Sequence, residues 1–239
     1  MEKIREQLSK LRLHGMLRRL QSLQETRKHH ELSFSDGLQL LLQGEEEERD
    51  NNRFNRLRKN ASFRYQASLE ELRYDNSRGL DKSVISRMAS AEYIRKGESI
   101  LITGATGSGK SFLASALGHH ACQMGFKVSY FNMQKLLLRM KMSRAEGTIL
   151  RLFDRIAKTE LLILDDFGLT PLDRQQQLDL MELIEDRHGK KSTIVSSQIP
   201  VASWFDVIGE ETIADAILDR LVNTSYRIEL KGDSLRKKM

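Results

Sequence analysis

The order of apolar and polar residues divides this chain into two parts. Over residues 2–60, apolar side chains recur three to five positions apart with charged residues between them, which predicts amphipathic helices. Further along, short aliphatic or β-branched runs alternate with helical stretches, and the predicted strands are 99–103, 128–131, 161–166, 192–198 and 225–230. Strands separated by helices predict an α/β fold, with a parallel sheet flanked by helices, preceded by a small all-helical domain.

The first part is predicted to contain two long helices. Residues 2–23 predict one basic amphipathic helix in which Gly15 is the weak point. Ser33 and Asp36 have the spacing of a capping box, with Asp in place of the usual Glu, so a second helix is expected to begin there.

The region between the two parts is less regular. Asn76 to Gly79 is a turn signal, and a further helix is expected between Asp81 and Gly97. We therefore predict a helical module over residues 1–65, a linker over 66–80 and the α/β domain over 81–239.

The segment between the strand at 99–103 and the following helix fits the phosphate-binding pattern G-x-x-x-x-G-K-[ST] at every fixed position. Its glycines let the backbone turn sharply and point N–H groups at phosphate oxygens, and the new helix adds the positive end of its dipole. An ordinary strand–turn–helix connection is the alternative, but the flanking strand and helix are the context that the motif requires. The predicted nucleotide-binding residues are Gly104, Ala105, Thr106, Gly107, Ser108, Gly109, Lys110 and Ser111.

Two of these residues and two acids further along predict triphosphate and magnesium chemistry. Lys110 is expected to reach the β- and γ-phosphates, and the Ser111 hydroxyl to ligate Mg²⁺. The aliphatic run at 161–164 ends in Asp165 and Asp166, at the sheet edge where open α/β folds bind ligands. Asp165 is suited to hold Mg²⁺ through water opposite Ser111, and Asp166 to orient the attacking water.

Three more polar residues have two interpretations each. Gln198 or Ser197, at the polar end of the fourth strand, could contact the γ-phosphate or the water, or could simply lead into a turn. Arg220 lies at the border of an apolar helical stripe, where both a surface ion-pair partner and an arginine finger would sit.

The formal net charge is +6, which favours an anionic partner beyond the nucleotide. Residues 45–60 change from four glutamates to a basic end, which is either a solvated helix face or a phosphate-contacting face interleaved with aromatics. The DNA-binding candidates are Arg53, Arg56, Arg58, Lys59 and Arg64.

Cysteine content and apolar run length suggest a compartment. The single Cys122 forms no internal disulfide, and no apolar run approaches the ~20 residues that span a bilayer, so we expect a cytoplasmic protein without membrane contact.

The order of the motifs narrows the enzyme class. One strand lies in sequence between the phosphate-loop strand and the Asp165 strand, and a strand with a polar tip follows, which suits the P-loop NTPases that include the AAA+ ATPases. The absence of an Asn-Lys-x-Asp sequence argues against a Ras-like GTPase. A nucleotide kinase would need an arginine-rich lid, which no stretch supplies convincingly.

Nearly the whole chain resembles the IstB family of ATPases, helpers of IstA/IstB-type insertion sequences that are similar to DnaC helicase loaders. The wider resemblance lies in the motifs above, in Leu-His-Gly-Met at 13–16 and in Trp204. The family-specific part is Asp-Ala-Ile-Leu-Asp-Arg-Leu at 215–221 and Glu-Leu-Lys-Gly-Asp-Ser-Leu-Arg at 229–236.

The resemblance implies roles for particular residues. Lys110 and Ser111 become Walker A ligands, Asp165 and Asp166 the Walker B pair, and Gln198, with Ser197 as second choice, sensor 1. Arg220 becomes an arginine finger that completes a neighbouring subunit's site, and Arg236 a sensor-2-like contact. Because the second Walker B acid is Asp rather than the Glu of the wider AAA+ pattern, hydrolysis is expected to be slow.

The resemblance also implies a biological role. The chain would bind ATP and Mg²⁺, form a homo-oligomer on double-stranded target DNA, and recruit and stimulate an IstA-type transposase, with ATP turnover stimulated by DNA. A DnaC-like replicative helicase loader is the first alternative, and a metabolic P-loop kinase the second.

Overall fold

The computed structural model describes residues 2–26, 30 and 32–235, and the chain divides into two compact units, 1–56 and 57–239. The first unit contains α1 (Glu2–Lys10), α2 (His14–Glu25) and most of α3 (Phe34–Ala61). The hydroxyl of Ser33 accepts from the backbone N–H of Asp36 at 3.2 Å, which confirms the predicted start of α3.

The predicted single helix over residues 2–23 is wrong, because the chain reverses between α1 and α2 at Arg12, whose φ is +58°. Gly15 is not a weak point in the helix. A Cβ at this position would lie 2.2 Å from the carbonyl oxygen of Gly44, so the glycine is what lets α2 approach α3 closely.

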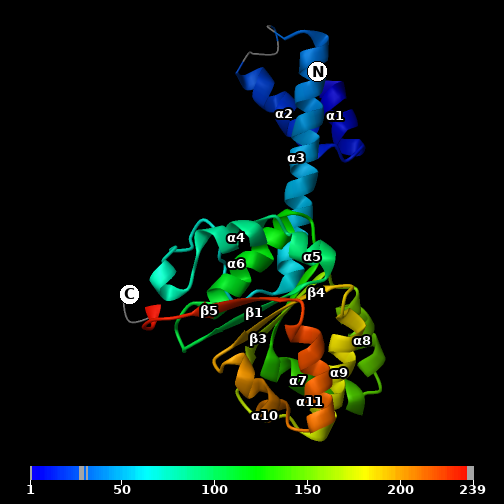
Figure 1. Ribbon diagram of the computed structural model, residues 1–239. Helices are drawn as coiled ribbons and strands as arrows, with labels where there is room; N and C mark the ends of the chain where they lie inside the picture. The colour runs from blue at the N-terminus through cyan, green and yellow to red at the C-terminus, as the bar shows by residue number, and fades with distance from the viewer. Residues whose placement is uncertain (1, 27–29, 31, 236–239) are drawn as a thin grey trace. The chain divides into compact units, whose positions relative to one another are not determined.

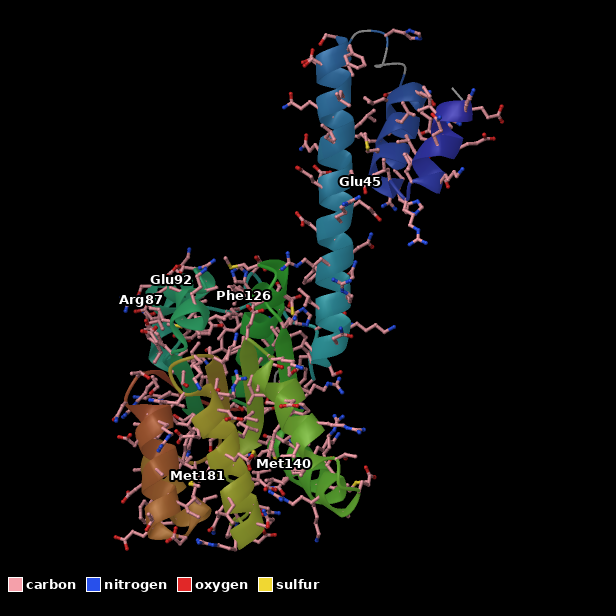
Figure 2. All side chains as sticks on the ribbon, turned by 90° about the vertical axis from the view of Figure 1, so that its right-hand side faces the viewer. Glu45, Arg87, Glu92, Phe126, Met140 and Met181 are labelled. Carbon is pink, nitrogen blue, oxygen red and sulfur yellow. The ribbon has the colours of Figure 1, made fainter. Side chains whose placement is uncertain are left out.

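Glu45, on α3, caps the N-terminus of α2 (Figure 2). The backbone N–H groups of Gly15 and Met16 donate to its Oε2 at 2.8 and 3.2 Å, and Arg49 donates to its Oε1 at 2.8 Å. Helix N-termini leave such N–H groups without intrahelical partners, so this buried carboxylate joins the two helices.

We expect Glu45→Gln to loosen α2 in a pH-dependent way. Burial raises the pKa of Glu45, but hydrogen bonds from Arg49, Met16 and Gly15 lower it by more, to below the ordinary 4.5. A depressed folded-state pKa means that the stabilisation is complete above pH 4.5 and is lost as the pH falls through the folded-state pKa. Hydrogen–deuterium exchange over residues 14–25 at pH 7 should accelerate about tenfold, and the difference from wild type should shrink in acid after correction for intrinsic rates. The exposed neighbour Glu46→Gln is the control, and equal exchange in the two variants would contradict the capping role.

The second unit is built on a five-stranded parallel sheet with the order β2-β3-β4-β1-β5. The strands are β1 (Ser99–Gly104), β2 (Val128–Asn132), β3 (Leu161–Phe167), β4 (Ser192–Ser197) and β5 (Ser225–Leu230), which confirms every predicted strand to within a residue at each end. The helices are α4 (Lys82–Ala89), α5 (Glu92–Lys96), α6 (Lys110–Gln123), α7 (Met133–Ala145), α8 (Ile149–Ala157), α9 (Arg174–Arg187), α10 (Trp204–Ile208) and α11 (Glu211–Val222), with short 3-10 turns at Asn76–Arg78 and Val201–Ser203.

Two layers of helices cover the sheet, α4 to α6 on one face and α7 to α11 on the other (Figure 1). Alternate strand residues supply the two cores, as a period of two requires. Leu101, Leu162, Leu164 and Val195 join the core that contains α7 to α11. Ile163 lies on the opposite face, within reach of α6 at Gly118. Among the described helices, none is long and apolar enough to cross a membrane.

Two details of the region before the sheet differ from prediction. The helix expected between Asp81 and Gly97 is divided into α4 and α5 at Ala91, whose φ is +55°. Residues 66–80, which we predicted as a linker, belong to the second unit, since Ala67, Leu69 and Leu72 bury their side chains there.

Candidate nucleotide-binding site

The phosphate-binding loop connects the end of β1 to the start of α6. Gly104 and Gly107 have φ values of +148° and +83°, which side chains rarely tolerate. A Cβ at these positions would lie 2.3 Å from the carbonyl oxygen of Leu230 and 2.1 Å from the Ser234 hydroxyl. The N–H of Leu235 also donates to the Gly107 carbonyl at 3.0 Å, so the segment after β5, part of the family-specific sequence, packs against the loop.

Lys110 and Ser111 lie at the first two positions of α6. The buried Lys110 ammonium donates to the carbonyl oxygens of Gly104 and Ala105 at 2.6 and 2.9 Å, inside the loop. The Ser111 hydroxyl donates to Oδ1 of Asp165 at 2.9 Å. The structure thus brings together the lysine, hydroxyl and carboxylate that the sequence predicts.

The carboxylate of Asp165, at the end of β3, is completely buried and fully hydrogen-bonded. Ser111 and Ser196 donate to its Oδ1, and the Tyr130 hydroxyl donates to its Oδ2. Burial and then Asp165 raise the pKa of Tyr130, so the phenol remains a proton donor. Sequence reasoning missed Ser196 and Tyr130, because neither residue is adjacent to Asp165 in the chain and the pairing of β2 and β4 with β3 is not known from the sequence.

A β-bulge lets the side chains of Asp165 and Asp166, which are consecutive in β3, reach the same site. Leu164 pairs with Val195, but Phe167 pairs with Ser197, so β3 has one extra residue at this point. Asp166 has a φ of +59°, in the left-handed region. In a regular strand consecutive side chains point to opposite faces, whereas here both carboxylates contact the same guanidinium group.

That guanidinium belongs to Arg64, one of the predicted DNA-binding residues. Its Nη1 donates to Oδ2 of Asp166 at 2.9 Å and lies 3.3 Å from Oδ2 of Asp165. Burial lowers the pKa of Arg64, but Tyr65, Asp166 and Asp165 raise it by more, so the side chain stays charged. The basic run in the sequence concealed this role, since charge alone does not identify a partner 101 residues away.

Asn132 is the second partner of Asp166 that the sequence did not single out. Its side-chain amide, at the end of β2, donates to the same Oδ2 of Asp166 at 3.0 Å. The sequence offered one signal, since Asn132 directly follows the predicted strand 128–131. The carboxyl ends of parallel strands meet at one edge of the sheet, which is the edge that carries Asp165.

The structure separates the two candidates at the end of β4, Ser197 and Gln198. Gln198 reaches the phosphate-binding loop, where the Thr106 hydroxyl donates to its Oε1 at 2.7 Å. Ser197 is buried, donating to the carbonyl oxygen of Phe167 at 2.8 Å and accepting from the N–H of Ile199 at 3.2 Å, so its hydroxyl joins β3 to β4.

Arg220, near the end of α11, pairs within its own chain. Its guanidinium contacts Glu185 of α9 and donates to the carbonyl oxygen of Ala216 at 2.8 Å. This is the surface ion pair that the sequence allowed as one interpretation, and it leaves the side chain 27% exposed. Arg236, the sensor-2 candidate, lies outside the described residues.

The loop and the acids fit a magnesium–triphosphate group. The Ser108 hydroxyl, inside the loop, is one of four buried side-chain polar atoms that lack a hydrogen-bond partner among the described residues, and it would suit a phosphate oxygen. The hydroxyl of Ser111 and the carboxylate of Asp165 are oxygen donors of the type Mg²⁺ prefers when phosphates and waters complete its coordination. Within the described part of the chain, no cluster of three His, Cys, Asp or Glu residues could hold a metal ion without such help.

The remaining DNA-binding candidates all lie on α3 with exposed side chains: Arg53, Arg56, Arg58 and Lys59. At ~100° per residue, Arg53 and Arg56 share one face of the helix, with Lys59 beside them, whereas Arg58 points about 160° away from Arg56. Arg58 also lies close enough to His119 to contribute, after burial, to lowering its pKa. The predicted basic surface is therefore divided between two faces of one helix.

The sheet order and this site define a P-loop NTPase of the AAA+ type. Solved structures with the same fold include the DnaC helicase loader (TM-score 0.60, 22% identity, 70% of this chain and 98% of that one) and AMPPCP-bound DnaA from Aquifex aeolicus (TM-score 0.61, 20% identity, 74% and 54%). Residues 6–239 match the family described as IstB-like ATP binding protein. An insertion-sequence ATP-binding protein of Sinorhizobium fredii is 39% identical over 232 residues, which cover 97% of this chain and 95% of the relative. The chain belongs to the IstB-like ATP-binding family.

Proposed function

We propose that this chain is an ATP-dependent, DNA-binding regulator of transposition that oligomerises on target DNA and recruits and stimulates an IstA-type transposase. The observation that carries the proposal is the family match over residues 6–239, together with a relative of nearly equal length from an insertion sequence. This relative supports a transposition partner over a replicative helicase, since the likeness to DnaC is one of fold.

The proposed reaction is magnesium-dependent hydrolysis of ATP. Loop N–H groups and Lys110 would hold the phosphates, Ser111 and Asp165 would hold Mg²⁺, and the bound ion would neutralise charge on the β- and γ-phosphates. Asp166 would orient the attacking water, and Gln198, already bonded to the loop at Thr106, would sense the γ-phosphate.

We further propose that the site is completed by another copy of the chain. Arg220 would act in trans as an arginine finger and stabilise charge in the transition state. Assembly of the copies on DNA would then control ATP hydrolysis. The bound nucleotide, ATP or ADP, would in turn be the switch for oligomer formation.

Electron microscopy of the full chain with duplex DNA tests this function. ATP should give regular oligomers on the DNA that ADP does not maintain, and the ATP-bound assembly should retain the transposase encoded beside it. Hydrolysis that is insensitive to DNA, together with phosphate transfer to a small acceptor, would instead favour the metabolic kinase.

The α3 surface yields a prediction about salt dependence. Replacing both Arg53 and Arg56 by Ala should weaken duplex binding and reduce the slope of log affinity against log salt by about 2, because each phosphate contact contributes about 0.9. Fluorescence anisotropy at several salt concentrations measures this. Arg58→Ala, on the other face of the same helix, is the matched control. An unchanged slope in the double variant would show that this face of α3 is a solvated surface that does not contact DNA phosphates.

A further inference from the structure

An ion pair joins Arg64, three residues after the end of α3, to the two acids of β3. The side chain of Asp165 is 0% exposed and that of Asp166 is 17% exposed, whereas Arg64 is 40% exposed. The acids are thus fixed in the sheet, and the arginine is the partner that is able to move away into solvent.

The chain delivers Arg64 through a short segment, residues 61–65, which we call the latch segment. It begins with the last residue of α3, and Ser62 then turns the backbone at a φ of +59°. Phe63 packs on α6, with its ring 4.4 Å from that of His119 and so close to Gly118 that a Cβ there would lie 2.4 Å from it. On the other side of Arg64, the Tyr65 ring lies 6.3 Å from that of Phe112, also on α6.

Both ends of this ion pair are associated with unusual backbone conformations. Four non-glycine residues of the described chain have positive φ, and they include Ser62, two positions before Arg64, and Asp166 itself. Such conformations cost free energy and persist only where surrounding contacts hold them, as they often do at switch regions. The geometry therefore suits a contact that forms in one state and is released in another.

The chemistry of Asp166 explains what the contact would control. In ATP hydrolysis the water oxygen bonds to the γ-phosphorus, the bond to the β–γ bridging oxygen breaks, ADP leaves, and a proton of the water passes to a carboxylate. The Oδ2 atom of Asp166 accepts from the Arg64 guanidinium at 2.9 Å and from the Asn132 amide at 3.0 Å, so the two acceptor positions of this oxygen are both occupied. With Arg64 in place, Asp166 is held, and its Oδ2 atom has no acceptor position left for the attacking water.

We propose that Arg64 is a positioning residue that restrains Asp166 in the resting chain, and that displacement of the latch segment releases this acid for hydrolysis. The inference rests on the ATPase function and the DNA binding proposed above. Helix α3 begins in the first unit and ends at the latch segment, so a ligand bound along α3 has a covalent route to the nucleotide site. Duplex DNA is the ligand that the basic side chains of α3 fit.

Arg64→Ala in the full chain tests the restraint. The DNA-independent rate of hydrolysis should rise about tenfold, and the stimulation by DNA should shrink by a similar factor, while ATP affinity stays within about twofold. The increase should appear in kcat, with KM for ATP nearly unchanged, because Arg64 contacts the acid that acts on the water rather than the nucleotide. Arg64→Lys, which keeps the charge, should restore much of the restraint.

Arg95→Ala is a matched control. Arg95 also makes an exposed ion pair, with Glu92, and its guanidinium lies 5.5 Å from the ring of Phe126, as that of Arg64 lies 5.5 Å from the ring of Tyr65. This variant should leave the basal rate, the DNA stimulation and the KM for ATP unchanged.

Hydrogen–deuterium exchange in the wild-type chain tests the same proposal without depending on ATP turnover or on the folding of a variant. Exchange over residues 61–66 should accelerate when duplex DNA is added to the chain with a non-hydrolysable ATP analogue. The proposed restraint is wrong if Arg64→Ala binds ATP normally and its basal rate of hydrolysis stays equal or falls. It is also wrong if adding DNA leaves hydrogen exchange over residues 61–66 unchanged. A wild-type chain that binds ATP without hydrolysing it even on DNA would instead refute the ATPase function.

Discussion

Lys110→Ala will abolish useful ATP binding, with a loss of affinity of at least about 100-fold. The ammonium lies inside the loop, on the carbonyl oxygens of Gly104 and Ala105, and it is 5% exposed. Replacing it by a methyl group removes the positive charge placed for the β- and γ-phosphates. A 100-fold loss corresponds to ~2.7 kcal/mol, within the range of hydrogen bonds to charged groups.

Titration with a fluorescent ATP analogue in the presence of Mg²⁺ measures this loss. Lys96→Ala, at an exposed position on α5, is the control and should bind normally. Affinity within about threefold of wild type in Lys110→Ala would remove the central claim about this site, since the loop's backbone would then suffice.

Arg220→Ala will bind ATP with nearly normal affinity but will lose hydrolysis by about 10³-fold. Arginine fingers contribute 10³ or more because they stabilise charge that develops in the transition state rather than in the bound nucleotide. In a single chain Arg220 pairs with Glu185, so its catalytic use requires a second copy. The wild-type rate per subunit should accordingly rise with protein concentration.

Two comparisons separate the finger from a structural ion pair. Glu185→Gln removes the partner on α9 but keeps the guanidinium, so it should retain hydrolysis. Mixing Arg220→Ala with Lys110→Ala should restore activity, because the second variant supplies Arg220 to the first variant's intact loop. Mixtures that remain inactive, or a rate per subunit that is independent of concentration, would contradict action in trans.

The local sequence predicted the sheet closely, because its strands are short runs rich in aliphatic, β-branched or aromatic residues, bounded by polar or glycine residues. It predicted Ser111 and Asp165 as a pair, and their side chains are joined at 2.9 Å. It failed where the backbone changes direction without a glycine. Arg12 and Ala91 divide predicted helices at positive φ, and neither residue type signals such a turn.

By itself, the sequence of this protein determined the α/β class and the phosphate-binding loop, because both depend on residues that are neighbours in the chain. Only the tertiary structure decided the partners of those residues. The bulge at Asp166, the cap that Glu45 places on α2 and the pairing of Arg64 with Asp165 depend on which strand or helix lies alongside. Arg64 shows the difference most clearly: it follows a basic run that predicts a DNA surface, whereas its side chain contacts the two acids of the nucleotide site.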